Sequence, residues 1–222
     1  MHYDTARNQH GLKHDPFKAL VAPRSVGWIG TVSRDGVRNL APYSFFNAVS
    51  DRPPMVVFSS GGFKDSLRNV LDTGEFTCSM ATWDLREAMN MSSAAVAPGV
   101  DEFALAGLTP AASPYVGAPF VAEAPAALAC QLWQTLPLPP RREGEASSYT
   151  LVIGRVVGIH IRDELLVDGQ VPTAAWQPLA RMGYMDFSVV TPATTFTMNR
   201  PLASADGLSA HLQPGPWDGV YR

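Results

Sequence analysis

The chain has 222 residues, 46% of them hydrophobic, which is enough apolar material for one large domain with a substantial core. Its 17 basic and 20 acidic residues give a formal net charge of −3, which argues against the clustered basic surface typical of nucleic-acid-binding proteins. The one notable basic pair, Arg141-Arg142, is expected in a solvated loop. The N-terminus shows neither the apolar region of a signal peptide nor a membrane span, so we expect a cytoplasmic protein without membrane or nucleic-acid partners.

Residues 1–22 are polar and predict an N-terminal extension ahead of the domain. Several short apolar runs with turn signals between them then predict a mainly β, antiparallel barrel or sandwich with short helices. The Asp35-Gly36 pair between two such runs indicates a hairpin, because glycine accepts the positive φ that hairpin turns need. The expected strands are Val26–Ser33, Arg38–Phe46, Met55–Ser60, Glu75–Ala81, Ala127–Leu132 and Tyr149–Arg162.

Two helices interrupt the strands. Leu67, Val70 and Leu71 give the segment Lys64–Asp72 an apolar face, and Gly74 follows where a C-terminal glycine belongs. Asp65 or Ser66 is expected to cap the start of this helix. The second helix is expected at about Asp84–Met91, with Asp84 as its N-cap.

The start of the first helix indicates an anion site. A lysine at the positive end of a helix is mildly unfavourable, and a bound phosphate would reverse that effect. The phosphate could accept hydrogen bonds from backbone N–H groups, the Ser66 hydroxyl and the Lys64 ammonium together. The alternative is a solvated lysine beside an ordinary aspartate cap. Since the dinucleotide and P-loop glycine patterns are absent, a nucleotide site here would be of another kind.

Other reactive side chains favour structural roles. Cys78 and Cys130 lie in apolar strand-like runs and are expected to be buried free thiols. No histidine pair has a convincing metal spacing; His10 and His14 are four apart, but Gly11 and Pro16 disfavour a helix there. His160 is interpreted as structural. Trp28, Trp83 and Trp133 are expected in the core or at an interface.

Two long segments lie outside the regular pattern. Residues 92–126 are expected to pack on the barrel and shape the entrance of the site, with one helical turn at Leu105 to Leu108 and Glu102 fixing its loop. Residues 191–222 are rich in proline and glycine and form a C-terminal extension that could embrace a partner subunit.

An ordered set of motifs resembles the flavin reductase-like family, whose members bind FMN in a Greek-key-like split β-barrel and include reductase components of the nitrilotriacetate monooxygenase kind. The motifs keep the family's order over about residues 20–190, and the resemblance implies one domain over residues 23–190. They are N-L-A-P-Y-S-F-F-N (Asn39–Asn47), S-D-R-P-P (Ser50–Pro54), F-S-S-G-G-F-K-D-S-L-R-N (Phe58–Asn69), T-G-E-F (Thr73–Phe76), M-N-M-S-S (Met89–Ser93), V-D-E-F-A-L-A-G-L-T (Val100–Thr109), I-G-R-V-V-G-I-H-I (Ile153–Ile161) and P-L-A-R-M-G-Y (Pro178–Tyr184).

The resemblance implies roles for particular residues. Ser44 and Asn47, with Tyr43, Phe45 and nearby backbone, would contact the isoalloxazine ring. Ser59 and Ser60 would line the path of the ribityl chain and phosphate. The phosphate itself would be held by Lys64, Asp65, Ser66 and Asn69, and the C-terminal side of the site would be closed by Arg181 and Tyr184.

The resemblance also implies an FMN-dependent oxidoreductase that uses NADH or NADPH. Such a protein would be a homodimer and could supply reduced flavin to a partner monooxygenase. An alternative is a flavin-binding or electron-relay protein without free reductase turnover; another is the same barrel with a ligand such as haem, which Lys64 and Ser66 argue against. Two departures bear on turnover: Tyr149 or a neighbour stands where many relatives have a histidine, and Ala129-Cys130 where many have Glu-Cys.

Overall fold

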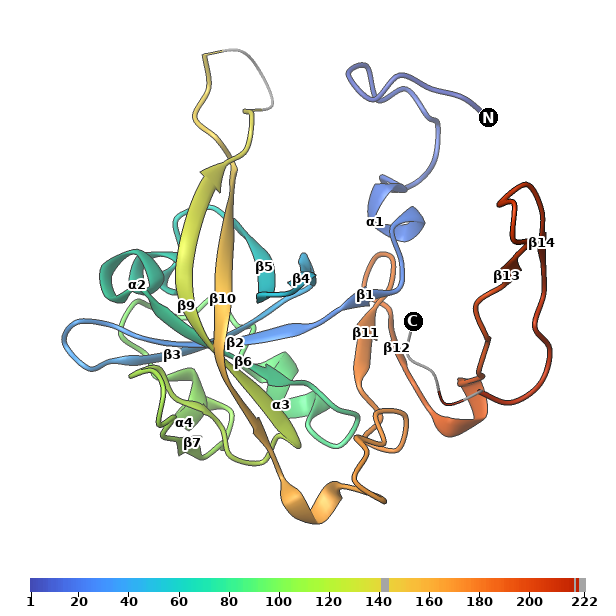
Figure 1. Cartoon of the computed structure of the whole chain (residues 1–222). Coiled ribbons are helices and arrows are strands. Elements are labelled where there is room, and N and C mark those ends of the chain that lie inside the picture. Colours follow the sequence, from blue (N-terminus) through green and yellow to red (C-terminus); the bar gives the residue numbers. More distant parts are fainter. Residues whose placement is uncertain (141–143, 218, 220–222) are drawn as a thin grey trace.

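The computed structural model describes residues 1–140, 144–217 and 219, so the pair Arg141-Arg142 lies outside the described residues. A seven-stranded antiparallel sheet forms the split barrel, in the order β3-β2-β6-β9-β10-β5-β4 (Figure 1). Its strands are β2 (Gly27–Val32), β3 (Arg38–Tyr43), β4 (Phe46–Asp51), β5 (Pro54–Gly61), β6 (Glu75–Met80), β9 (Ala126–Pro137) and β10 (Tyr149–Ile161).

The two edge strands of this sheet, β3 and β4, follow each other in the chain. The expected single strand Arg38–Phe46 is therefore wrong: Tyr43 pairs with Gly27 of β2, whereas Phe46 pairs with Phe58 of β5. Residues 44 and 45 carry the chain from one pairing to the other. The other expected strands are confirmed with small shifts, except that β9 continues to Pro137. The hairpin at Gly36 is also confirmed, with φ +82°.

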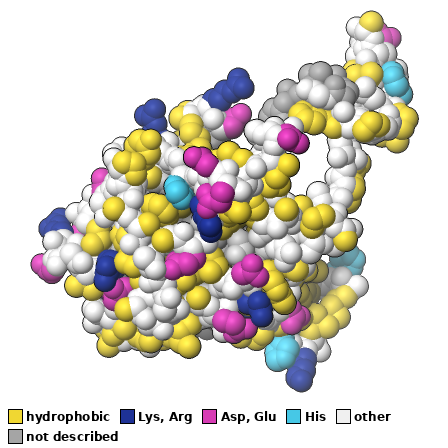
Figure 2. All heavy atoms as spheres, turned by 90° about the horizontal axis from the view of Figure 1, so that it is seen from below, with side chains coloured by type: hydrophobic (Ala, Val, Ile, Leu, Met, Phe, Trp, Pro, Cys, Tyr) yellow, Lys and Arg dark blue, Asp and Glu magenta, His cyan; other side chains and the backbone are white. Residues whose placement is uncertain are grey.

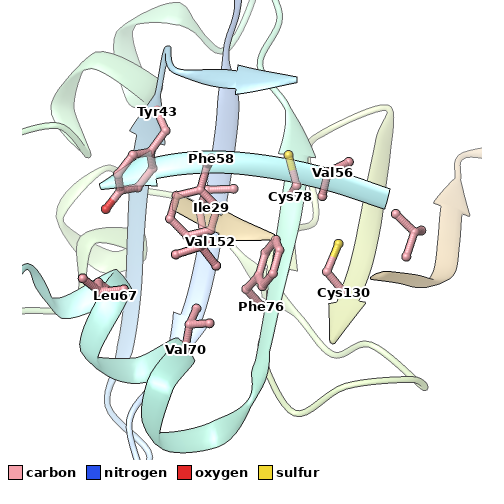
Figure 3. Packing of buried hydrophobic residues seen from close by; sticks show 11 residues of the cluster. Ile29, Tyr43, Val56, Phe58, Leu67, Val70, Phe76, Cys78, Cys130 and Val152 are labelled. Atoms are coloured by element: carbon pink, nitrogen blue, oxygen red, sulfur yellow. The ribbon is translucent and has the colours of Figure 1, made fainter. Parts of the chain in front are cut away.

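The barrel interior is one apolar cluster. Figure 3 shows Ile29, Phe58, Phe76 and Val152 meeting inside the barrel, with Leu67 and Val70 entering from the helix α2 (Asp65–Thr73). The two cysteines belong to this cluster as buried free thiols, which confirms that prediction. The remaining members are Tyr43, Val56, Cys78, Cys130 and Val156.

Helix α2 confirms the predicted helix, and Gly74 ends it with φ +76°. The predicted cap is wrong: Lys64 occupies the N-cap position, and no side chain caps the helix there. The side chain of Asp65 instead pairs with Arg68, and Ser66 points into the protein. The second helix, α3 (Arg86–Met91), begins two residues later than expected, so Asp84 does not cap it.

The excursion 92–126 packs on the barrel, as expected, against β2, β3 and β6. It holds α4 (Glu102–Leu105), β7 (Pro110–Ala111) and β8 (Phe120–Val121). The helical turn starts three residues earlier than predicted because the Asp101 side chain accepts hydrogen bonds from the N–H groups of Phe103 and Ala104. A second apolar cluster lies between the excursion and the sheet, and Phe103 and Trp28 are both fully buried in it. Trp133, in contrast, is 62% exposed and is not a core residue.

Beyond the main sheet, the N-terminal segment and the C-terminal part of the chain meet. The short helix α1 (Phe17–Leu20) precedes β1 (Arg24–Ser25), which joins β11 (Leu179–Arg181) and β12 (Phe187–Val189) in a three-stranded sheet. A Cβ atom on Gly183, between β11 and β12, would lie 2.6 Å from the Cβ atom of Ala19. The turn between β11 and β12 is thus packed directly against α1 (Figure 1).

Residues 192–217 form an arm that stands away from the barrel, as Figure 2 shows. It begins with a 3₁₀ turn at Pro192–Thr194 and contains the short hairpin of β13 (Leu202–Ala203) and β14 (Ala210–His211). A second 3₁₀ turn, Asp163–Leu165, follows β10. None of the described helices has the length and apolar character needed to cross a membrane.

Candidate functional site

A cavity of about 500 Å³ opens beside the junction of β3 and β4. One wall is that junction, with Pro42, Tyr43, Ser44 and Phe45, and a second is the end of β5 with the start of α2. The opposite wall comes from the excursion, at residues 92–96 and 98. Segments far apart in the sequence therefore build one hollow, and its floor includes residues of β3 and α4.

Two backbone hydrogen bonds fix the walls of the cavity. The N–H of Ser59 donates to the carbonyl oxygen of Phe45 at 2.9 Å, which ties the end of β5 to the β3–β4 junction. The N–H of Gly62 donates to the carbonyl oxygen of Ser148 at 2.9 Å. Gly62 has φ +80°, a conformation that costs glycine little, and it turns the chain from β5 toward α2.

Two hydroxyl groups in the cavity walls lack hydrogen-bond partners. Tyr43 is 7% exposed and Ser59 8% exposed, and neither hydroxyl has a hydrogen bond of normal geometry to another described residue, although the hydroxyls of Ser66 and Ser60 lie near that of Tyr43. Burial raises the pKa of the Tyr43 hydroxyl, so it stays a donor at neutral pH. In Figure 3 the Tyr43 oxygen lies at the edge of the apolar cluster, away from Cys78 and Cys130. Because a buried unpaired hydroxyl costs free energy, these groups fit a polar ligand in the cavity.

One end of the cavity is suited to an anion. Lys64 is exposed at the N-cap of α2, where the first helical N–H groups have no partner inside the helix. Arg68 lies one turn on, with its guanidinium paired to Asp65 and 5.6 Å from the ring centroid of Phe63. These charges and the helix end together favour a phosphate group.

Another part of the lining is apolar and can receive a flat ring. It consists of Ala41, Pro42, Phe45, Ala94, Ala95, Val96 and Pro98. Tyr149 also lines the cavity, and its ring lies 6.0 Å from that of Phe45 in an edge-on arrangement. The lining therefore combines positively charged groups at the start of α2 with apolar and aromatic side chains.

At the floor of the cavity, buried polar side chains join four elements. The Asn39 side chain lies at their centre: its Oδ1 accepts from the Ser66 hydroxyl at 2.8 Å, and its Nδ2 donates to Glu102 Oε2 at 2.9 Å. Glu102 Oε2 also accepts from the N–H of Leu40 at 3.0 Å, which confirms that Glu102 fixes its loop. Asn69 donates to the Thr31 hydroxyl at 3.0 Å. This network anchors α2 and α4 to β2 and β3.

The structure brings seven of the predicted site residues to the cavity and leaves five outside its lining. Those that line it are Tyr43, Ser44, Phe45, Ser59, Lys64, Asp65 and Ser66. Of the others, Ser60 donates to the carbonyl oxygen of Gly62, and Asn69 is buried in the network. Asn47 is exposed on β4, where its own side chain accepts from the N–H of Ala48. Arg181 and Tyr184 lie on the sheet of β1, β11 and β12 and the turn beside it.

Sequence reasoning gave no site role to several residues that line the cavity. Asn39 and Glu102 belong to the recognised motifs but were assigned no ligand role, and Arg68 stands in the middle of the predicted helix. Tyr149 lines the cavity at the start of β10. Only the pairing of β10 with β5, Tyr149 opposite Gly61, brings it to the site.

The remaining histidines and acidic groups make no metal site among the described residues, where no three metal-ligating side chains come together. His10 packs on Tyr3 and His14 on Tyr184, with ring centroids 5.2 and 5.5 Å apart, so the two histidines have different partners. His160 is exposed and lies 4.6 Å from the ring of Phe120.

Comparisons with known proteins agree with this architecture. The family model described as "Flavin reductase like domain" matches residues 21–177. An uncharacterized protein of Aquifex aeolicus is 35% identical over 170 residues, covering 74% of this chain and 83% of its own length. Nitrilotriacetate monooxygenase component B from Bacillus cereus superposes with a TM-score of 0.78 at 29% identity, covering 89% of this chain and 98% of that one.

A third comparison bears on the fold alone. A candidate flavin reductase with a split barrel domain from Shewanella frigidimarina has a TM-score of 0.75 at 22% identity, covering 92% of this chain and 100% of that one. The family model alone matches well over half of the 222 residues. This chain belongs to the flavin reductase-like family.

Proposed function

We propose that the protein is an FMN-binding oxidoreductase in which NADH or NADPH reduces the flavin. The observation that carries the proposal is the pair of buried hydroxyls of Tyr43 and Ser59, neither with a hydrogen bond of normal geometry, in a cavity lined by both Lys64 and Phe45. FMN has the matching chemistry: a phosphate, a polar ribityl chain and a flat ring.

In this proposal the residues have distinct tasks. Lys64, Arg68 and the first N–H groups of α2 hold the phosphate, and the hydroxyls of Tyr43 and Ser59 bond polar atoms of the cofactor. The resemblance implies that Ser66 holds the phosphate, but its hydroxyl donates its proton to Asn39. The Ser66 oxygen can therefore only accept a hydrogen bond from a ligand. Ser66 and Asn69 thus support the start of α2 from behind.

When bound, the flavin supplies the redox chemistry, by accepting a hydride from the nicotinamide. The protein contributes binding, orientation and exclusion of water. Phe45 and the segment 94–98 provide an apolar enclosure for the ring. No acid–base group is required for hydride transfer itself, so Tyr149 in place of a histidine is compatible with turnover.

We further propose a cytoplasmic homodimer that supplies reduced flavin to a monooxygenase. The similarity to a protein named as a monooxygenase component supports the last part. The residues 1–22, 23–190 and 191–222 then serve as N-terminal extension, flavin domain and dimer-embracing extension.

The test is a visible absorption spectrum of the purified protein with added FMN, followed by NADH or NADPH without oxygen. We expect the flavin bands to shift on binding and to bleach rapidly with a nicotinamide. Flavin that binds but stays oxidised would refute the reductase and leave an electron-relay or flavin-binding protein. A spectrum identical to that of free FMN would refute the cofactor assignment.

A further inference from the structure

Two arginines face each other on neighbouring strands beside the cavity. Arg24 of β1 pairs directly with Arg181 of β11 in the antiparallel register. Residues directly opposite in such a pair have Cα atoms about 4.5–5.5 Å apart, and like charges there are destabilising. The repulsion between the two charges therefore opposes the stability of this small sheet.

No acidic side chain neutralises either arginine in the part of the chain that the structure describes. Arg24 donates only to carbonyl oxygens: those of Lys18, Val21 and, at 2.8 Å, Met182. Arg181 donates to the carbonyl oxygen of Tyr184 at 2.6 Å. The ion pairs between described residues include neither arginine.

Donor groups remain open on both side chains. Arg24 is only 8% exposed, yet its Nε–H is buried without an acceptor. On Arg181, Nη2 has the bond to Tyr184 and a longer contact to the Met185 sulfur, while Nε and Nη1 bond no described residue. Burial, and then the charge of Arg181, lower the pKa of Arg24. A bound anion would relieve both effects.

This arginine pair lies next to the proposed flavin site. The guanidinium carbon of Arg24 is 5.9 Å from the ring centroid of Phe45, which lines the cavity. On the outer side, Tyr184 holds φ +54°, an uncommon conformation for a residue with a side chain, and its ring packs on His14. Figure 1 shows β1 leading from α1 toward the barrel near β4, with β11 beside β1.

We propose that Arg24 and Arg181 form a second anion subsite, which binds the phosphate groups of the nicotinamide dinucleotide that reduces the flavin. Guanidinium groups match phosphate oxygens in pairs, and two of them on adjacent strands suit a diphosphate. The phosphate of FMN already has Lys64, Arg68 and the α2 N-terminus, so the second subsite serves the second substrate. This inference rests on the proposed function.

The experiment compares two electron donors on the Arg181→Gln variant. Arg181 is the residue to change, because Arg24 holds three carbonyl groups of the fold and its loss could prevent folding. NADH and NADPH carry the diphosphate, whereas 1-benzyl-1,4-dihydronicotinamide carries the reactive ring without any phosphate. We expect Arg181→Gln to raise KM for NADH and NADPH about 10- to 100-fold, the worth of one or two charged hydrogen bonds, with little change in kcat.

The benzyl analogue should be used equally well by wild type and variant. Arg181→Lys, which keeps the charge but loses the planar fork, should raise KM for the dinucleotides by a smaller factor. Arg162→Gln is the matched control: it removes an arginine whose partner is Glu164, away from the cavity lining, and should leave both donors unaffected.

Equal losses with both donors, or no loss with either, would overturn the proposal. A variant that dissociates into monomers while keeping its KM for NADH would show that the arginines instead meet acidic groups of a second copy, which also overturns it.

Failure of the proposed function is recognised separately. If no dinucleotide reduces the flavin, calorimetric titration of the FMN-supplemented protein with ADP-ribose still tests the subsite. Saturable binding that Arg181→Gln weakens at least tenfold would support a phosphate subsite; absence of binding to the wild type would refute it.

Discussion

Lys64 stands at the N-cap of α2 with its side chain in solvent, an unfavourable place for a cation in a protein without a ligand. Lys64→Ala should therefore leave the ligand-free protein about as stable as before and weaken FMN binding by about 1.5–3 kcal/mol, the typical worth of a charged hydrogen bond. Fluorescence titration with FMN measures this. The control is Lys13→Ala, another exposed lysine outside the cavity lining; unchanged FMN affinity in Lys64→Ala would refute the phosphate assignment.

The Tyr43 hydroxyl allows a test in which stability and binding move in different directions. Because it has no partner among the described residues, Tyr43→Phe removes an unpaired buried donor and should not lower the free energy of unfolding without FMN. The same change should weaken FMN binding by about 0.5–1.5 kcal/mol. Urea unfolding with and without FMN measures both. A loss of stability without FMN would contradict the view that this hydroxyl awaits a ligand.

The two buried thiols give a pH-dependent prediction. Burial raises the pKa of Cys78 to about 12 from 9.0 and raises that of Cys130 further. Above about pH 9 the unfolded chain therefore loses thiol protons that the folded chain keeps, so stability should fall as pH rises from 9 toward 12. Urea unfolding across this range measures the fall, which should be shallower in Cys78→Ala. Reaction of either thiol with a disulfide reagent at pH 8, without denaturant, would contradict their burial.

At the scale of single residues, motifs predicted to form the site supply part of the cavity lining. Ser44, Phe45, Ser59 and Lys64 lie in motifs next to turns, and the cavity receives them all. Polar residues on α2 were harder to place, because a helix turns Ser66 and Asn69 to one face and only tertiary packing decides whether that face meets a ligand or the protein. Here it meets Asn39 and Thr31.

Among the elements, the break between β3 and β4 escaped prediction for a physical reason. Both halves are extended and apolar, so nothing local marks residues 44 and 45 as the place where the hydrogen-bonding partner changes. Partner choice depends on β5, which lies later in the chain. The break shapes the site, because it brings Ser44 and Phe45 to the rim of the cavity instead of into a continuous ladder.

The contact between α1 and the β11–β12 turn can be tested by adding one methyl group. In Gly183→Ala the new Cβ atom would lie 2.6 Å from Ala19 Cβ and 2.8 Å from Ala19 Cα, so α1 must move. We expect a loss of about 1–3 kcal/mol of stability, typical of overpacking, and faster proteolysis within residues 1–22. Limited proteolysis followed by mass spectrometry measures the second effect.

Gly117→Ala is the control for this substitution. Its Cβ atom would meet only the end of the Glu75 side chain, at 3.4 Å, and that side chain can shift. If proteases cut the N-terminal segment as slowly in Gly183→Ala as in Gly117→Ala, this contact does not hold α1 in place.

For the whole molecule, the arm of residues 192–217 is the part that exposes apolar side chains away from the barrel (Figure 1). Four of its apolar side chains, Phe196, Met198, Leu208 and Leu212, are 76–86% exposed. Apolar groups gathered on a projecting segment are typical of interaction surfaces. The side-chain amide of Asn199 donates to the carbonyl oxygen of Pro216 at 2.9 Å and links the two ends of the arm.

Removal of residues 191–222 should therefore convert a dimer into a folded monomer. Light scattering after size-exclusion chromatography measures the mass, and circular dichroism verifies that the barrel remains folded. A truncated chain that stays dimeric, or a monomeric full-length chain, would contradict the role of the arm. The sequence predicted an extension here from its proline and glycine content, but its shape could not be predicted because few local contacts define it.

The hydrogen bonds of the Arg24 guanidinium also constrain the order in which segments of the chain can dock during synthesis. It fastens the carbonyl groups of Lys18 and Val21, near the start, to that of Met182, more than 150 residues later. The N-terminal segment thus leaves the ribosome first but can dock among the last, after the barrel has formed. Nascent chains stalled before residue 182 should hold residues 1–22 open to proteases, and release of the complete chain should close them.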